Sequence, residues 1–337
     1  MILVGKLITV VITLLLYTVY SGKSVHSDSF RGRSLFKPKV TETEQVALVS
    51  ACLEFAPDSV LSKVWPGSSG TTEAAPVAYT SELPSSVLDI CKDVGSVSEL
   101  MTKLHPIQPE TVGFIERETV GQNSNPKWHT QRLGRITASH FHDVFTKIES
   151  VKKFGHEQVN VKPLLNVLLG LHTVPDSLPA LKHGREMEPK AKARLVSMLT
   201  DLGHANVKLQ DCGLYVVSEK PFLAASPDAI VECDCCSMSI VEIKSPMPRT
   251  GTPDYLLKQD EKWQLKTGHR HRTQMLGQMA ATHIHRGYFF VYMAEPVLVK
   301  VAFDGNRWAA VSANLEDFFI KVMAPALLQL QHKRDAQ

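Results

Sequence analysis

Residues 227–244 have the sequence PDAIVECDCCSMSIVEIK, in which a Pro-Asp pair and a Glu-Ile-Lys triplet flank a short insert. Successive side chains of a β-strand point to opposite faces, so Glu242 and Lys244 share one face of the second strand. The insert, residues 231–239, contains enough small and polar residues to turn the chain back antiparallel. The stretch therefore predicts a hairpin in which Asp228 and Glu242 meet across adjacent strands.

Two carboxylates that meet on a hairpin repel each other unless a cation lies between them. Magnesium suits this position because it takes oxygen ligands and is usually held by one or two carboxylates together with substrate phosphate. The ammonium group of Lys244 could orient or help deprotonate a metal-bound water, or stabilise charge on the phosphate. This pattern indicates phosphodiester hydrolysis. The alternative is an ordinary hairpin with a solvated Glu-Lys pair, since alternating V-E-I-K is common in strands.

A third carboxylate lies upstream, in the segment HGREMEPKAKARLVSML at residues 183–199. Apolar residues recur in this segment at helical spacing. Proline is tolerated in the first turn of a helix, so Pro189 predicts that Glu188 lies near the helix start. From there Glu188 could point at the hairpin and supply a third metal ligand. The alternative is that Glu186 and Glu188 only interact favourably with the helix dipole.

The segment WHTQRLGRITASHFHDVF, residues 128–145, combines an arginine with a predicted helix start. Ser139 or Thr137 is a candidate helix N-cap, which leaves backbone N–H groups free to bind an anion. Arg132 suits a phosphate clamp at this position because its planar guanidinium grips two oxygens at once. The alternative is a capped helix with a surface arginine.

Residues 269–293, HRHRTQMLGQMAATHIHRGYFFVYM, are predicted to form a helix followed by a buried strand. Gln274 and Gln278 are four residues apart and therefore share a helix face. An amide can hold a water or a phosphate oxygen without adding charge. Both glutamines could equally be solvated, so the signal depends on the other motifs.

These blocks, taken in this order, resemble the YqaJ viral recombinase family, which is similar to phage lambda exonuclease and falls in the PD-(D/E)xK nuclease superfamily. The resemblance covers roughly residues 125 to 300, and the combination of motifs is specific although each motif alone is weak. The residues that carry it are Trp128, Arg132, Gly134, Ile136, Thr137, Ala138, Ser139, Gly184, Glu188, Ser226, Pro227, Asp228, Glu242, Ile243, Lys244, Ser245, Pro246, Gln274 and Gln278.

The resemblance implies an α/β (α+β) fold with a restriction-endonuclease-like core, in which helices flank a central mixed β-sheet. It also implies a set of metal ligands, namely Glu188, Asp228, Glu242 and the carbonyl of Ile243. Magnesium is the implied ion, with manganese as a substitute. The family implies these roles; residue spacing does not.

The same resemblance assigns the remaining site residues. Lys244 would handle the nucleophilic water, Arg132 and Ser139 would contact a terminal phosphate, and Gln274 would lie near the water. Two features depart from the family: Ser245 replaces a frequent cysteine, and a common Gln-x-Gln-x-Gln pattern is reduced here to Gln274 and Gln278.

The 337-residue chain is 44% hydrophobic and long enough for one large domain plus a smaller region. We expect a hydrophobic leader at residues 1–22, a helical and linker region at 23–120, the nuclease domain at 121–305, and a C-terminal helix packing on the core at 306–337. The leader suits a signal peptide or an uncleaved membrane anchor. A misassigned start would instead leave a nuclear or other intracellular protein.

With 37 Lys and Arg against 34 Asp and Glu, the net charge is only +3, so nucleic-acid binding must use local basic patches. One candidate is residues 256–272, where Lys262 and Lys266 could follow a phosphate backbone and Trp263 could stack on a base. The alternative is a solvated, charged loop.

Six cysteines give no disulfide framework, and three of them, Cys233, Cys235 and Cys236, crowd into the hairpin insert. We expect a structural, thiol-rich turn. The alternative is a zinc site, although the usual structural site needs four ligands and C-x₂-C type spacing. Reduced thiols fit an intracellular setting better than a secreted one, which conflicts with the leader.

The sequence thus predicts a magnesium-dependent deoxyribonuclease of viral or mobile-element origin that acts on duplex DNA ends. Two alternatives stay open: a catalytically inactive DNA-binding remnant of the same fold, and a structure-specific endonuclease that uses the same residues. DNA is the expected partner, homo-oligomerisation is left open, and membrane contact is expected only if the leader is an anchor.

Overall fold

The computed structural model describes residues 83–155, 157–172, 177–247 and 251–335. The chain divides into two units, Met1–Ala78 and Tyr79–Gln337, and every described residue lies in the second. The expected leader and most of the expected linker region therefore lie outside the described residues. Among the helices of the described part, none is long and apolar enough to cross a membrane.

A five-stranded mixed sheet forms the centre of this unit, in the order β10-β9-β6-β5-β2. β6 pairs parallel with β9, whereas the other neighbouring strands pair antiparallel. The bounds are β2 Lys208–Gln210, β5 Ala229–Cys233, β6 Cys236–Lys244, β9 Arg286–Val291 and β10 Val297–Ala302.

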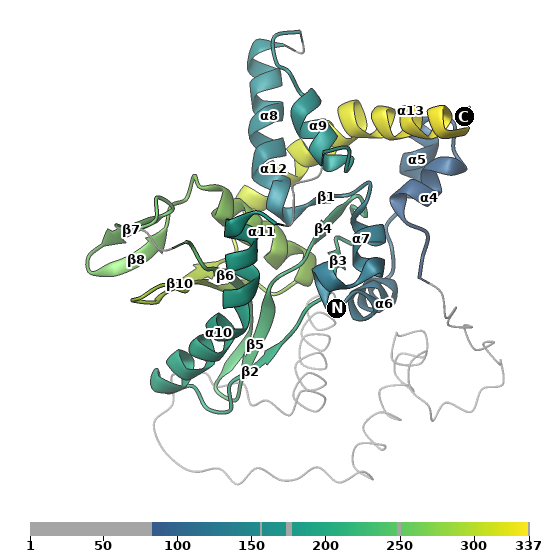
Figure 1. Cartoon of the computed structure of the whole chain (residues 1–337). Coiled ribbons are helices and arrows are strands. Elements are labelled where there is room, and N and C mark those ends of the chain that lie inside the picture. The colour runs from purple at the N-terminus through teal and green to yellow at the C-terminus, as the bar shows by residue number, and fades with distance from the viewer. Residues whose placement is uncertain (1–82, 156, 173–176, 248–250, 336–337) are drawn as a thin grey trace, which may run out of the picture. The chain divides into compact units, whose positions relative to one another are not determined.

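Helices cover both faces of this sheet: α10 (Pro179–Asp201) lies along one and α11 (Arg270–Thr282) along the other (Figure 1). Val241 of β6 packs in the apolar cluster that contains Leu195 of α10. Ile240, the preceding residue, packs in the cluster that contains Met275 of α11. This alternation follows from strand geometry and buries both faces of β6. The expected mixed sheet flanked by helices is confirmed.

A smaller sheet in the order β1-β4-β3 joins the N-terminal part of the domain to the core. β1 (Ile136–Thr137) runs parallel to β4 (Leu223–Ala225), and β4 pairs antiparallel with β3 (Tyr215–Val216). β4 ends three residues before Asp228, so this sheet brings the segment around Thr137 close to the start of the predicted hairpin.

Helices α4 to α7 precede the sheets and α12 to α13 close the chain. Their bounds are α4 Val87–Lys92, α5 Val97–Lys103, α6 Pro109–Glu118, η1 Gln122–Ser124, α7 Pro126–Arg132, η2 Ala138–His140, α8 Phe141–Phe154, α9 Lys162–Leu168, α12 Gly305–Phe318, the π-helical turn η3 Phe319–Met323, and α13 Ala324–Asp335. Three of these helices, α4 to α6, lie within residues 86–120, in the region expected to be helical and linker. Phe318, Phe319 and Leu327 are buried, as expected of a packing C-terminal segment.

Candidate active site

The hairpin predicted at residues 227–244 is present as strands β5 and β6. Ala229 lies opposite Val241, and the Asp228 N–H donates to the Val241 carbonyl at 3.0 Å. The Asp228 side chain reaches across the hairpin, where its Oδ2 accepts a hydrogen bond from the Ile243 N–H at 2.6 Å. Asp228 is thereby fixed beside the strand that carries Glu242.

Glu242 is buried, with 1% of its surface exposed, and three side chains donate to its carboxylate. Lys244 Nζ lies 2.5 Å and Gln274 Nε2 lies 2.7 Å from Oε1, while Gln278 Nε2 lies 2.5 Å from Oε2. Gln274 and Gln278 both project from α11, as their four-residue spacing predicts. The structure thus brings Glu242, Lys244 and Gln274 together, and adds Gln278.

The electrostatics of this cluster follow from burial and from two neighbouring carboxylates. Burial, the largest influence, together with the charge of Glu242, raises the pKa of Asp228 to about 8, although Lys244 opposes this. Burial lowers the pKa of Lys244, but the negative charges of Glu242 and Asp228 outweigh burial, so its pKa is raised overall. Lys244 is therefore a cation at neutral pH.

Glu188 borders the same cavity as Asp228. A cavity of about 280 Å³ is lined by Glu188, Asp228, Ile243 and Lys244, with Ala180, Leu181, Gly184 and Ser245 completing its wall. The Glu188 side chain is 42% exposed and pairs with Lys192 at 2.8 Å. Glu188, the third predicted carboxylate, therefore lines the cavity, and in this structure it forms an ion pair with Lys192.

The expectation that Pro189 marks the first turn of this helix is wrong. Helix α10 begins at Pro179, so Pro189 lies inside it and Glu188 lies in its third turn. The helix tolerates an internal proline although the ring cannot donate a backbone hydrogen bond to the preceding turn. Glu188 consequently interacts with side chains along the helix, not with the positive end of the helix dipole.

Arg132, Thr137 and Ser139 form a small polar cluster. Arg132 Nη2 donates to Thr137 Oγ1 at 3.2 Å, and the two hydroxyl oxygens of Thr137 and Ser139 lie 3.3 Å apart. The guanidinium lies 4.0 Å from the centre of the Trp128 ring, and burial lowers the pKa of Arg132 to about 10. Arg132 is still charged at neutral pH and is held between a ring and a hydroxyl.

The prediction that Ser139 or Thr137 caps an α-helix is wrong. A 3₁₀ turn, η2, occupies Ala138–His140, so α8 begins only at Phe141 and has His140 at its N-cap position. Thr137 precedes the 3₁₀ turn but makes no side-chain capping bond. Its hydroxyl accepts a hydrogen bond from Arg132 instead. Short 3₁₀ segments often precede α-helices, and here the segment moves the start of α8 past Ser139.

Trp128 connects this polar cluster to the hairpin. The indole N–H donates to Ser226 Oγ at 2.9 Å, and Ser226 lies two residues before Asp228. The amide of Gln278 also approaches the Ser226 carbonyl, at 3.4 Å. Arg132 and the carboxylates are thus tied to one short segment of chain.

Gly277 allows α11 to approach the 3₁₀ turn closely. A Cβ at this position would overlap the Phe141 ring and contact Ala138. Because glycine has no Cβ, the helix lies close enough for Gln274 and Gln278, on either side of it, to reach Glu242.

The basic segment predicted at residues 256–272 includes an exposed hairpin, β7 (Leu256–Gln259) and β8 (Lys262–Leu265). Lys262 and Lys266 are exposed, which suits contact with a phosphate backbone. Trp263, however, is half-buried and packs against the apolar cluster of the central sheet, near Lys258. The expectation that Trp263 is free to stack on a base is therefore wrong.

The donor set fits a hard divalent cation. No hydrogen bond from the described residues reaches Asp228 Oδ1, and Glu242 Oε2 accepts only one, so both oxygens keep lone pairs for a ligand. Burial first, and then the charge of Glu242, raise the pKa of Asp228, so a cation bound between the two carboxylates would favour their ionised forms. Magnesium prefers oxygen donors of this kind.

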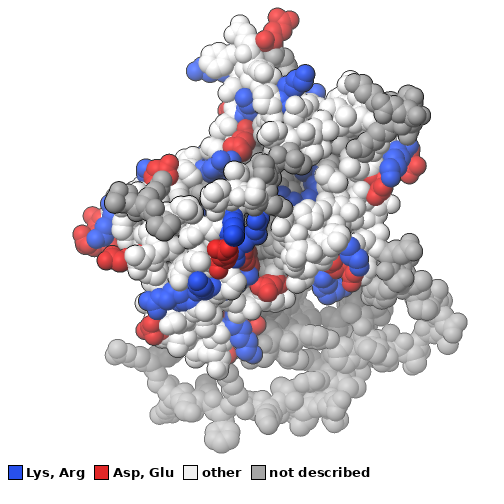
Figure 2. Space-filling view, viewed as in Figure 1, with Lys and Arg blue, Asp and Glu red and all other residues white. Residues whose placement is uncertain are grey.

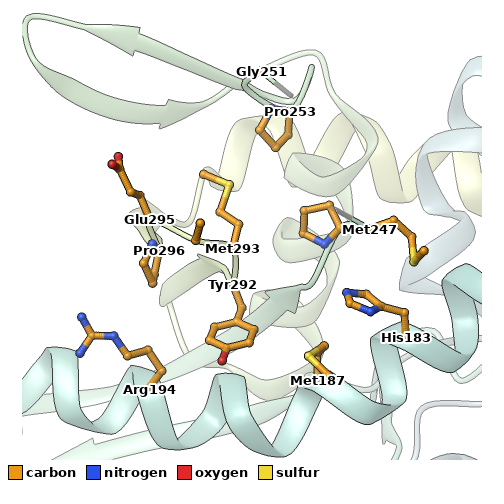
Figure 3. Close-up of a pocket in the computed structure, with 12 residues that line it drawn as sticks. His183, Met187, Arg194, Met247, Gly251, Pro253, Tyr292, Met293, Glu295 and Pro296 are labelled. Carbon is orange, nitrogen blue, oxygen red and sulfur yellow. The ribbon is translucent and has the colours of Figure 1, made fainter. Parts of the chain in front are cut away.

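A second cavity of about 780 Å³ is lined by residues of α10 and by residues that follow strands β6 and β9. His183 and Met187 of α10 lie across it from Tyr292 and Met293, and Met247 and Pro253 are at its wall (Figure 3). Glu188 follows Met187 by one residue, so the large cavity and the carboxylate cavity adjoin the same stretch of helix.

Two residues with a role at the site escaped the sequence prediction. Lys192 binds both Glu188 and Asp211 at 2.8 Å, and a correct helix start would have suggested the first pair, because the two residues are four apart. His271 lies near Lys244, and burial lowers its pKa to about 3, so it is neutral. No sequence signal distinguishes it from the neighbouring histidines.

Charges of both signs are interleaved on the face shown in Figure 2. This agrees with a net charge of +3 and with the expectation that nucleic acid must be bound by local groups.

Comparison with known proteins identifies one family. Residues 127–285 match the model of the YqaJ-like viral recombinase domain, so the resemblance indicated by the sequence is confirmed. No curated protein sequence matches the chain.

Several solved structures are similar to the chain at low identity. The alkaline exonuclease LHK-Exo from Laribacter hongkongensis is 23% identical, with 62% of this chain and 97% of that chain covered and a TM-score of 0.44. The shutoff and exonuclease protein of Kaposi's sarcoma-associated herpesvirus is 13% identical, with coverage of 65% and 73% and a TM-score of 0.40. The structure of a SOX–DNA complex is 13% identical, with 72% of this chain and 78% of that chain covered and a TM-score of 0.44.

Proposed function

We propose that the YqaJ-like viral recombinase domain of this chain is a metal-dependent deoxyribonuclease that hydrolyses phosphodiester bonds from the ends of duplex DNA. Magnesium is the proposed ion and manganese its substitute. The observation that carries the proposal is that Asp228 and Lys244 line a cavity together with Glu188, while Lys244 also binds the buried Glu242. The family match over residues 127–285 supports it.

The carboxylates of Glu188, Asp228 and Glu242, with the Ile243 carbonyl, would hold the cation. When bound, a divalent cation neutralises the scissile phosphate and activates water. Gln274 and Gln278 contribute by fixing the Glu242 carboxylate, since neutral amides orient it without adding charge. Glu188 must leave Lys192 to join the other two carboxylates.

Lys244 acts as a donor and not as a base in this proposal. Its raised pKa keeps the ammonium group protonated at neutral pH, so it has no free lone pair with which to accept a proton. Of its three hydrogens, one is directed at Glu242. The others can orient the attacking water or stabilise the negative charge that develops on the phosphate oxygens.

End recognition is assigned to Arg132 and Ser139. The Trp128 ring and the Thr137 hydroxyl already hold the guanidinium, so little side-chain freedom is lost when it binds a phosphate. Ser139 is exposed beside it and can donate to a phosphate oxygen. Lys262 and Lys266 would contact the duplex backbone farther along.

The direct test measures nucleotide release from linear duplex DNA by the full chain, with and without magnesium. We expect release only with the ion, and a loss of at least about 100-fold in Asp228→Asn and in Lys244→Ala, as is typical when a group that stabilises transition-state charge is removed. Asp93→Asn and Lys103→Ala, which change exposed residues of the same types, should retain full activity.

DNA binding without cleavage under varied ends and metals would instead favour the inactive remnant. Equal activity of the Asp228 and Asp93 variants would place the chemistry elsewhere in the chain.

A further inference from the structure

Four soft side chains converge at the end of the β5–β6 hairpin that is remote from Asp228. The Nδ1 atom of His204 lies 3.3 Å from Cys235 Sγ, 3.5 Å from Cys233 Sγ and 3.6 Å from Cys236 Sγ. The sulfur of Cys235 lies 3.6 Å from that of Cys233 and 3.8 Å from that of Cys236. All four atoms lie within 4.8 Å of one another.

These distances are those of a tetrahedron around a zinc ion. With Zn–S bonds of about 2.3 Å and Zn–N bonds of about 2.0–2.1 Å, tetrahedral ligands lie about 3.8 Å apart for two sulfurs and about 3.6 Å apart for sulfur and nitrogen. A disulfide would require two sulfurs only about 2.05 Å apart. The three cysteines are free thiols, so the cluster is arranged for a shared ion and not for a covalent bridge.

Two local structures place the cysteines. Cys233 ends β5 and Cys236 begins β6, and the two residues lie opposite each other across the hairpin. Cys235 lies in the turn between them and is exposed. The turn and the two strand residues that flank it therefore supply three sulfurs at this end of the hairpin.

The fourth group, His204, comes from the end of α10 through a glycine turn. The Gly203 N–H donates to the Thr200 carbonyl and the His204 N–H to the Leu199 carbonyl, which is the Schellman arrangement at a helix C-terminus. Gly203 has φ +89°, a left-handed backbone conformation that residues other than glycine rarely adopt. The turn directs His204 toward the hairpin.

Further contacts hold this loop on the hairpin turn. The Asp234 N–H donates to the Ala205 carbonyl at 3.1 Å, and Asn206 Nδ2 donates to Asp234 Oδ2 at 2.6 Å. The histidine and the three thiols are thus brought together by backbone and side-chain bonds that do not themselves involve the thiols.

We propose that His204, Cys233, Cys235 and Cys236 bind one structural zinc ion. Four protein ligands complete the tetrahedral coordination, which is typical of structural zinc sites, whereas catalytic sites keep one position open. The ion would bind the C-terminal end of α10 to the turn of the hairpin. Glu188 lies earlier on the same helix, and Asp228 and Glu242 lie at the other end of the same hairpin, so zinc would stabilise the two elements that carry the carboxylates.

Metal content of the full chain tests the proposal. Protein purified under reducing conditions, supplied with zinc and passed through gel filtration should retain about one zinc per chain, measured by mass spectrometry of the metal. Cys235→Ser and His204→Ala should lose the ion and lower the melting temperature. His172→Ala, a change at another exposed histidine, should retain both.

Cobalt distinguishes this site from the carboxylates. Cobalt(II) substituted into the wild-type chain should show the thiolate-to-cobalt charge-transfer absorption, which oxygen ligands do not give, and Asp228→Asn should leave this absorption unchanged. The proposal is overturned if the reduced wild-type chain retains no zinc, if the two ligand variants retain as much as wild type, or if cobalt binds without the thiolate band.

Discussion

The Glu242 carboxylate illustrates how a buried charge is maintained at a site of this kind. Burying an unpaired carboxylate is costly, and here Lys244, Gln274 and Gln278 provide compensating hydrogen bonds. Lys244 is the only cation among these three donors, and it offsets the charge of Glu242. A divalent cation would supply the further positive charge that favours the ionised form of Asp228.

Gln278 provides a test of this arrangement, because it is fully buried and donates to the Glu242 oxygen that would face the ion. In Gln278→Leu the carboxylate loses its orientation, and we expect the magnesium concentration for half-maximal nuclease activity to rise about 10- to 100-fold, the usual effect of removing a group that orients a metal ligand. A metal titration measures this.

The matched control is Gln158→Leu, which changes an exposed glutamine. An unchanged magnesium requirement in Gln278→Leu, with its melting temperature close to that of wild type, would show that the amide does not orient a metal ligand.

Asp228 predicts a pH dependence of stability in the absence of metal. Its pKa in the folded chain is about 8, above the ordinary value of 3.8, so between these values the folded state binds the proton more tightly than the unfolded state. The stabilisation from this proton is complete below about pH 4 and is lost as pH rises through 8. The melting temperature of the metal-free chain should therefore fall across this window.

In Asp228→Asn this contribution is absent, so the fall should be smaller. Magnesium at pH 8 should raise the melting temperature of wild type more than that of the variant, because an ion that binds only the folded state stabilises it. Parallel pH profiles for the two proteins would contradict the assignment of the raised pKa to Asp228.

At the residue level, the sequence predicted which side chains meet but not how they pair. The period of two in a strand placed Glu242 and Lys244 on one face, and the four-residue spacing placed Gln274 and Gln278 on one face of a helix. The family resemblance was needed to bring the two pairs to one site. The pairing of Glu188 with Lys192 and the burial of His271 depend on contacts between elements that no local pattern encodes.

At the level of secondary structure, the predicted strands were recovered and the helix starts were not. Pro189 predicts a helix start, but the helix begins ten residues earlier, at Pro179, and packs Ala191, Leu195 and Leu199 against the sheet. Tertiary packing outweighs the local cost of proline. Likewise, the turn η2 shifts the start of α8 past Ser139.

The proposed zinc-binding capacity of the cysteine cluster is not evident from the sequence for a related reason. The sequence shows three thiols at a spacing that is unusual for zinc, whereas the fourth group, His204, is 29 residues before Cys233. His204 Nδ1 lies within 3.6 Å of all three sulfurs because the C-terminal end of α10 lies against the turn of the β5–β6 hairpin, a contact between elements that the local sequence does not reveal.

The β7–β8 hairpin yields a prediction about DNA affinity. In the double variant Lys262→Ala and Lys266→Ala, the loss of two phosphate contacts should weaken binding and lower the slope of log affinity against log salt by about 1.8, at about 0.9 per contact. Fluorescence anisotropy with a labelled duplex at several salt concentrations measures both quantities.

Lys258→Ala is the matched control, because Lys258 lies on the same hairpin but pairs with Glu261 at 2.5 Å. If it changes the salt slope as much as the double variant does, the effect reflects general charge and not contact by Lys262 and Lys266.

At the scale of the whole molecule, the proposed nuclease site is contained in the segment that the family match covers. Glu188, Asp228, Glu242, Lys244 and Gln274 all fall within residues 127–285. Helices α12 and α13 lie outside this segment yet contribute buried side chains, including Phe318 of α12 and Leu327 of α13, to the same apolar core as α8. The fold therefore extends beyond the matched segment, and the C-terminal helices are part of it.

The proposed preference for DNA ends rests on the position of Arg132 relative to the carboxylates. Trp128 contacts both the guanidinium and Ser226, so a phosphate held by Arg132 would lie near the segment that carries Asp228. A terminal phosphate fixed there would place an end of the duplex, and not an internal bond, at the site.

The most direct test of this account compares linear duplex DNA with covalently closed circular DNA of the same sequence, in magnesium, using the full chain and Asp228→Asn. We predict that the wild-type chain releases nucleotides from the linear substrate and leaves the circle intact, while Asp228→Asn degrades neither. Cleavage of the circle at a rate comparable to the linear substrate, or undiminished degradation by Asp228→Asn, would contradict it.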